Sequence, residues 1–131
     1  MTEDAYFKLL AEALSRAYAP YSRFAVGAVV RGESGRLYLG ANVENAAYPQ
    51  GWCAEASALA AMVMAGEIRL TEVAVMAERG RVCTPCGGCR QKLKEFAVPD
   101  TLVLLYSPEG LQESFALEEL LPHSFSGAHL S

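Results

Sequence analysis

The sequence predicts a single α/β domain of three layers, in which helices cover both faces of a mixed five-stranded sheet. The chain has 131 residues, a length that sustains one hydrophobic core. Its 52% hydrophobic and 20% charged residues are typical of an ordinary globular protein. Helical and strand-like segments alternate along it, with no repeat and no linker long enough to divide it. We therefore expect one domain over residues 1–131.

The first half is predicted to form one helix and a β-hairpin. Apolar side chains recur at helical spacing over residues 6–17, and this helix should end near Pro20. An apolar run over residues 24–31 is typical of a buried strand. Residues 32–35 then form a turn, and residues 36–43 return as the second strand. Two antiparallel strands should therefore open the sheet.

The second half is predicted to alternate helices and strands. Residues 54–65 are rich in Ala, Leu and Met and have almost no polar face, as in a helix buried on most sides. Residues 72–77 are predicted as a central strand, residues 86–96 as a helix and residues 101–106 as another strand. A fifth strand is expected over residues 111–117, antiparallel to the fourth through a hairpin turn.

Charge and cysteine content narrow the functional classes. Eleven Lys and Arg against 15 Asp and Glu give a net charge of −4, which disfavours a nucleic-acid partner. No stretch approaches 18 apolar residues and the N-terminus lacks a signal-peptide pattern, so we expect a cytoplasmic protein without a membrane partner. Three of the four cysteines lie within residues 83–89, and such clustering in a reducing compartment favours a metal over disulfides.

The cysteine spacing predicts an open zinc site. Cys53 begins one predicted helix, and Cys86 and Cys89 lie in the first turn of another, where the positive end of a helix lowers a thiol pKa. Cys86 and Cys89 project from the same helical face and can chelate one ion. Three thiolates leave the fourth zinc position to water, which is typical of catalytic sites. Glu55, two residues beyond Cys53, is predicted to be the general acid and base.

Two segments carry a family resemblance. Cys-Ala-Glu at residues 53–55 and Pro-Cys-Gly-Gly-Cys-Arg-Gln at residues 85–91 resemble the signature of zinc nucleoside and nucleobase deaminases. With residues 18–28, 42–48 and 120–125, the chain resembles the short, homotetrameric cytidine deaminases more than the larger polynucleotide-editing members. The resemblance implies a cytidine deaminase-like fold and the hydrolytic deamination of cytidine and 2′-deoxycytidine to the uridines plus ammonia.

The resemblance also implies roles for the metal site. One Zn²⁺ per chain is expected on Cys53, Cys86 and Cys89, with Glu55 carrying protons between the attacking water and the pyrimidine ring. Many family members have an arginine after this glutamate, hydrogen-bonded to the thiolates, whereas this chain has Ala56. A three-thiolate zinc carries a net charge of about −1, so another group should offset it. The two helix N-termini and Arg90 are the candidates.

The substrate pocket is likewise implied by the resemblance. Asn42 and Glu44 match residues that bind the ribose hydroxyls, and a carboxylate at that place disfavours a phosphate, so a free nucleoside is expected. The remaining matches are with residues that contact the base or complete the pocket. They are Phe24 as an aromatic wall, the backbone around Ala54 at the base edge, and Tyr48 and Phe125 at the pocket of a neighbouring subunit in a homotetramer.

Two alternative functions follow from the same residues. If Cys83 joined the other three cysteines, they would form a closed four-cysteine structural zinc site in a non-catalytic module, with Glu55 idle. The family has no ligand at the position of Cys83, and Pro85 stiffens the chain before Cys86, so we expect Cys83 to pack near the site without binding metal. The second alternative is a deaminase of a related aminopyrimidine nucleoside such as blasticidin S, which need not keep both ribose-binding side chains.

Overall fold

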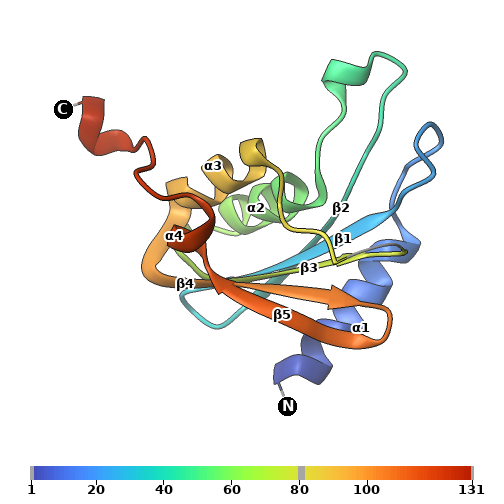
Figure 1. The fold of residues 1–131 in the computed structure, drawn as a ribbon, viewed down its shortest axis with the longest axis horizontal. Helices are drawn as coiled ribbons and strands as arrows, with labels where there is room; N and C mark the ends of the chain where they lie inside the picture. The colour runs from blue at the N-terminus through green and yellow to red at the C-terminus, as the bar shows by residue number, and fades with distance from the viewer. Residues whose placement is uncertain (1, 80–81, 131) are drawn as a thin grey trace.

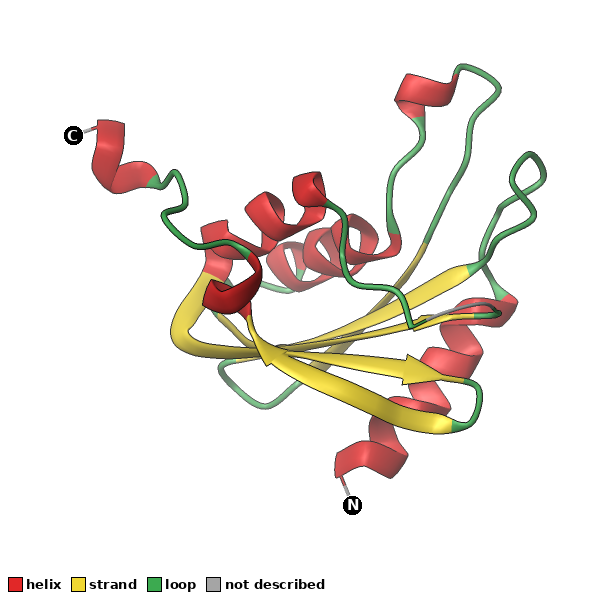
Figure 2. Ribbon diagram, in the orientation of Figure 1, coloured by secondary structure: helices red, strands yellow, loops and turns green. Residues whose placement is uncertain are grey.

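The structure, a computed structural model, describes residues 2–79 and 82–130 (Figures 1 and 2). Helices and strands follow in the order α1 (Thr2–Ser15), β1 (Val26–Gly32), β2 (Leu37–Ala41), α2 (Ala54–Met64), β3 (Leu70–Ala77), α3 (Gly87–Phe96), β4 (Ala97–Ser107), β5 (Gly110–Ala116) and α4 (Leu117–Leu120). Two short 3-10 helices, η1 (Tyr48–Gln50) and η2 (Gly127–Leu130), complete the described chain. In this part of the chain, no helix combines the length and the apolar character needed to cross a membrane.

Five strands form one mixed sheet in the order β2-β1-β3-β4-β5. β3 and β4 are parallel and are joined through α3, whereas the other neighbours are antiparallel. α1 covers one face, and α2 and α3 lie together on the other (Figure 1). The sheet and its two helical layers match the predicted fold class.

Apolar residues fill both faces of the sheet, because β1, most of β3 and residues 102–106 of β4 are nearly continuous apolar runs. On the α1 face, Tyr6 and Leu10 pack against side chains such as Val29 and Met76. On the opposite face, Met62 of α2 and Leu93 of α3 belong to one cluster with Ala28, Val30, Val73, Val75, Val103 and Leu105 of the strands. α2 and α3, whose starts carry the predicted zinc ligands, therefore pack on a core that extends across the whole sheet.

β2 lies unusually close to α2 because Gly40 has no side chain. A Cβ at Gly40 would be 2.3 Å from the Ala58 nitrogen and 2.5 Å from the Ala54 oxygen. The Ser57 hydroxyl also donates to the Ala41 carbonyl at 2.9 Å. These contacts set the height of α2 above the sheet and hence the position of Cys53 at its N-terminus.

The observed elements differ from the predicted ones mainly at their ends. α1 stops at Ser15, because the following chain turns extended and pairs with the segment after β2. The Tyr18 amide donates to the Asn42 carbonyl at 2.9 Å, and the Glu44 amide donates to the Tyr18 carbonyl at 2.8 Å. β4 begins at Ala97, four residues before the expected start, directly after α3.

Candidate metal centre

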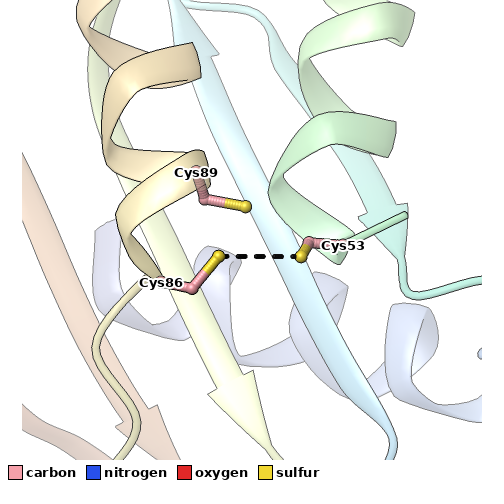
Figure 3. A group of neighbouring side chains, drawn as sticks. All are labelled: Cys53, Cys86 and Cys89. Atoms are coloured by element: carbon pink, nitrogen blue, oxygen red, sulfur yellow. Dashed lines mark hydrogen bonds between the residues drawn. The ribbon is translucent and has the colours of Figure 1, made fainter. Parts of the chain in front are cut away.

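Three cysteines meet where the N-termini of α2 and α3 come together (Figure 3). The sulfur atoms of Cys53, Cys86 and Cys89 all lie within 4.8 Å of one another. Cys53 Sγ and Cys86 Sγ are 3.9 Å apart. The three residues that the spacing predicts as ligands are therefore neighbours in space.

The helix ends explain why these sulfurs face one point. Cys53 and Cys86 are the N-cap residues of α2 and α3, with extended backbone angles, and Cys89 lies in the first turn of α3. Neither cap side chain makes a hydrogen bond to its own helix. Both thiols are therefore available to bind a metal. The positive ends of the two helix dipoles stabilise negative charge at this point.

The sulfur positions fit a zinc ion. Tetrahedral zinc with Zn–S bonds of about 2.3 Å holds its sulfur ligands about 3.8 Å apart. The 3.9 Å between Cys53 and Cys86 agrees with this spacing, and Cys89 lies within the same range of contact. Within residues 2–79 and 82–130, this is the only group of three His, Cys, Asp or Glu side chains close enough to hold a metal.

Hydrogen bonding within the cluster favours the thiolate form of one cysteine, Cys53. The Cys89 thiol donates to the Cys53 sulfur, which lowers the pKa of Cys53 to about 6 although partial burial opposes the shift. Contact with Cys86 and the positive charge of Lys92 lower the Cys53 pKa further. The same bond, together with burial, raises the pKa of Cys89. One anionic sulfur is therefore available to attract a cation before the others lose their protons.

Glu55 is a buried carboxyl beside this cluster. Only 4% of the residue is exposed, and burial raises the pKa of its carboxyl group. The negative charge of Cys53 adds to this rise, whereas the Cys89 thiol and Lys92 lower the Glu55 pKa. A raised pKa makes a carboxyl group a stronger base than an exposed one, which suits a residue that takes up a proton and then releases it.

Two cationic side chains of α3 have contacts that the sequence did not predict. Arg90 does not supply charge to the thiolates, because its guanidinium donates to the carbonyls of Pro85 and Leu120, both at 2.8 Å, and to the Thr84 hydroxyl. Lys92, which sequence reasoning missed, acts electrostatically on Cys53 and Glu55 instead. Its position three residues after Cys89, on the same helical face, was the available signal.

The Lys92 side chain extends along α3 to the first turn of the helix. Its ammonium nitrogen lies 3.6 Å from where a Cβ of Gly88 would be. Long side chains on a helix point back toward its N-terminus, which directs this charge to the end of α3 that carries Cys86 and Cys89. Lys92 thus contributes positive charge in a chain that has Ala56 beside the catalytic candidate.

Cys83 stays outside the cluster. It is not among the three sulfurs that lie within 4.8 Å of one another. Its thiol donates to the Thr84 carbonyl at 3.7 Å, and burial raises its pKa. A closed four-sulfur site therefore does not form in this arrangement.

A cavity of about 420 Å³ leads away from Cys53. Its lining includes Asn42, Glu44, Tyr48 and also Trp52, which the sequence analysis did not single out. The volume falls in the range of small-molecule sites. Three predicted substrate-binding residues thus share one cavity with a predicted metal ligand.

Asn42 and Glu44 also hold the protein backbone. The Asn42 amide donates to the Phe24 carbonyl and accepts from the Val26 amide, both at 2.9 Å. The Glu44 carboxylate accepts from the amides of Tyr21 and Ser22 and from the Ser22 hydroxyl, which lowers its pKa. Both residues line the cavity, and each side chain keeps further hydrogen-bonding capacity.

The other predicted residues occupy different surroundings. Ala54 is fully buried, and as the first residue of α2 its amide has no partner within the helix. Tyr48 is 76% exposed at the cavity. Phe125 is 55% exposed on the C-terminal segment, away from the η1 loop (Figure 1), and stacks on His129. Phe24 is half-buried beneath Arg79, outside the residues that line the cavity.

The chain is similar to proteins of one family in both sequence and structure. Residues 1–105 match the family profile described as the cytidine and deoxycytidylate deaminase zinc-binding region. A cytidine deaminase of Halalkalibacterium halodurans is 37% identical over 131 residues, covering 100% of this chain and 99% of the relative. A cytidine deaminase of Sporosarcina psychrophila is 40% identical over 127 residues, covering 95% of this chain and 93% of the relative. The crystal structure of cytidine deaminase from Burkholderia pseudomallei superposes with a TM-score of 0.89 at 37% identity, covering 95% of this chain and 100% of that one.

Proposed function

The chain belongs to the cytidine and deoxycytidylate deaminase family, and we propose that it hydrolyses cytidine and 2′-deoxycytidine to uridine and 2′-deoxyuridine, releasing ammonia. The observation that carries this proposal is the combination of three adjoining cysteine sulfurs, a buried carboxyl beside them and a cavity of small-molecule size that reaches Cys53. A four-sulfur structural site would need neither the cavity nor the carboxyl.

The metal ligands in this proposal are Cys53, Cys86 and Cys89, which would hold one Zn²⁺ per chain. Zinc with three protein ligands lowers the pKa of a water molecule at its open position. The two helix N-termini and Lys92 offset the negative charge of the thiolates. Without this compensation, three thiolates would make a bound zinc ion a poorer Lewis acid.

Glu55 moves the protons of the reaction. Its carboxylate takes a proton from the attacking water and gives it to the ring nitrogen next to C4 of the pyrimidine. After the oxygen has added to C4, the second proton of that water passes through Glu55 to the amine, which leaves as ammonia. Burial of Glu55 supports this role, because it brings the protonated and ionised forms closer in free energy.

The remaining assignments concern substrate recognition. Asn42 and Glu44 bind the ribose hydroxyls, Phe24 forms a wall beside the base, and the backbone around Ala54 meets the base edge. The negative charge of Glu44 in the cavity favours a nucleoside over a nucleotide, because a phosphate would be repelled.

Self-association completes the pocket in this proposal. Tyr48 and Phe125 are large, exposed aromatic side chains. Tyr48 lines the cavity of its own chain, and in a homotetramer both side chains would also reach the site of a neighbouring subunit. The reduced thiols of the metal site suit a cytoplasmic location. The whole chain acts as one catalytic domain.

Replacing Glu55 with Gln tests the assignment of the proton carrier. The variant keeps the size of the side chain but cannot accept a proton, so we expect the absorbance change of cytidine turnover to fall at least about 1,000-fold. Zinc measured by elemental analysis should stay at one ion per chain. Turnover near the wild-type rate, or loss of zinc with the activity, would contradict the proposed role.

Metal removal and a substrate panel separate the alternatives. Chelation should abolish turnover and leave the far-ultraviolet circular dichroism in place, because the core packs on both sheet faces independently of the site. A structural zinc module would instead unfold. Cytidine, deoxycytidine, cytosine, CMP and blasticidin S should be compared, and preference for blasticidin S would favour the rival substrate.

A further inference from the structure

Arg79 lies just beyond the end of β3 and opposite Phe24. The Glu78 amide continues the antiparallel β1–β3 ladder by donating to the Ala25 carbonyl at 3.1 Å. The next position of this register sets Arg79 against Phe24. The guanidinium carbon of Arg79 lies 5.5 Å from the centre of the Phe24 ring, within the range of a cation–π interaction.

Arg79 also holds the backbone that precedes this ring. Its Nη1 donates to the Arg23 carbonyl at 2.5 Å, while an ion pair with Glu78 at 2.7 Å orients the guanidinium. Arg23 has a φ of 56°, in the left-handed region that residues with a side chain seldom adopt. The Arg79 contact therefore stabilises the backbone conformation that directs Phe24.

On its other side, the same segment is tied to the cavity. The Phe24 amide donates to the Ser22 hydroxyl oxygen at 3.1 Å, and the Asn42 amide group donates to the Phe24 carbonyl at 2.9 Å. Ser22 in turn donates to Glu44. Ser22, Asn42 and Glu44 line the cavity, so Phe24 is held between cavity residues and Arg79.

We propose that Arg79 is a positioning residue for nucleoside binding, which fixes the Arg23–Phe24 segment and thereby the wall beside the pyrimidine ring. The inference rests on the proposed function, in which Phe24 belongs to the base pocket. Because the zinc ligands lie at the starts of α2 and α3, Arg79 acts on nucleoside affinity and leaves the chemical step unchanged.

Replacing Arg79 with Met removes the charge and the carbonyl contact but keeps an unbranched stem. From the usual strength of these two interactions, the KM for cytidine should rise between about 3-fold and 20-fold, with kcat within about 2-fold of wild type. The dissociation constant of uridine, measured by calorimetry, should rise by the same factor. Arg79→Lys restores a cation and should recover part of the affinity.

Arg69→Met is the matched control. Arg69 precedes β3 at its other end, and its guanidinium also donates to a backbone carbonyl, that of Ile68 at 3.0 Å. This variant removes the same charge without an aromatic partner, so its KM and uridine affinity should equal those of wild type. Zinc content and melting temperature of all variants show that the fold is retained.

A double-mutant cycle with Phe24→Leu tests the route of the effect. If Arg79 acts through the ring, its replacement should change KM much less when Phe24 is already absent. Equal effects in both backgrounds, or an unchanged uridine dissociation constant in Arg79→Met, overturn the inference. A wild-type chain that binds uridine but does not deaminate cytidine would refute the proposed function instead.

Discussion

The contact between Gly40 and α2 gives the most direct test of how the fold positions the metal site. In a Gly40→Ala variant, the new methyl group would lie 2.3 Å from the Ala58 nitrogen, whereas ordinary contacts begin at 3.4 Å. The atoms that it meets belong to the α2 backbone and cannot rotate away. α2 must therefore shift by about 1 Å from the sheet, and Cys53 must shift with it.

We expect Gly40→Ala to cost about 3 kcal/mol, the upper end of the usual range for overpacking, because the obstruction is backbone. With an unfolding entropy of about 2.1 cal/mol/K per residue, this cost lowers the melting temperature by about 10 °C. Displacement of Cys53 should also weaken zinc binding. Thermal denaturation by circular dichroism and elemental analysis measure the two effects.

Gly127→Ala is the control for Gly40→Ala, because a Cβ at Gly127 would meet no atom within 4 Å. In this variant the free energy of unfolding changes only through the unfolded chain, by less than about 1 kcal/mol. If the melting temperature of Gly40→Ala lay within about 2 °C of that of Gly127→Ala, the proposed packing of β2 against α2 would be wrong.

Three further predictions concern other parts of the molecule. Cys83→Ser should retain wild-type zinc content by elemental analysis, since Cys83 lies outside the sulfur cluster, and loss of zinc would make it a ligand. Glu44→Gln should destabilise the fold most near neutral pH, because the lowered pKa of Glu44 adds stability that is lost as pH falls below 4.5; unfolding curves at several pH values should converge in acid, and a constant difference would refute this. Tyr6→Phe removes the buried hydroxyl that donates to Glu72 and should cost about 1 to 2 kcal/mol in denaturant unfolding with zinc content unchanged, because Tyr6 packs on the opposite face of the sheet.

Much of the fold could be predicted because apolar runs buried on two sides are visible in local sequence. α2 and α3 begin within one residue of their predicted starts, since each follows an N-cap cysteine. The predicted end of α1 was wrong because the apolar spacing continues to Ala17. The pairing of Tyr18 with the chain after β2, which follows the helix, is a long-range contact that local spacing does not show. The early part of β4 was missed because Pro99 and Asp100 are exposed and polar or strand-breaking.

The candidate site was predictable to the extent that helix spacing determines which side chains converge. Cys86 and Cys89 share a helical face, so their proximity follows from position alone. The direction in which a long side chain points does not follow from its position on the helix. Arg90 turns to carbonyls of the loop and the C-terminal segment, and Lys92 turns to the thiolates, although both occupy the same helix. Arg79 depends on the register between β1 and β3, which no local pattern contains.

The contacts of Arg90 and Gln91 link the metal-binding helix to the C-terminal segment. Arg90 donates to the Leu120 carbonyl at 2.8 Å, and Gln91 donates to the Phe125 carbonyl at 3.0 Å. These residues directly follow Cys89, and in the proposed tetramer Phe125 enters the pocket of the next subunit. A shift of α3 on nucleoside binding would therefore move Phe125, which completes the pocket of a second subunit in this proposal. Cytidine saturation curves with a Hill coefficient different from one are the expected signature of this mechanical coupling between pockets.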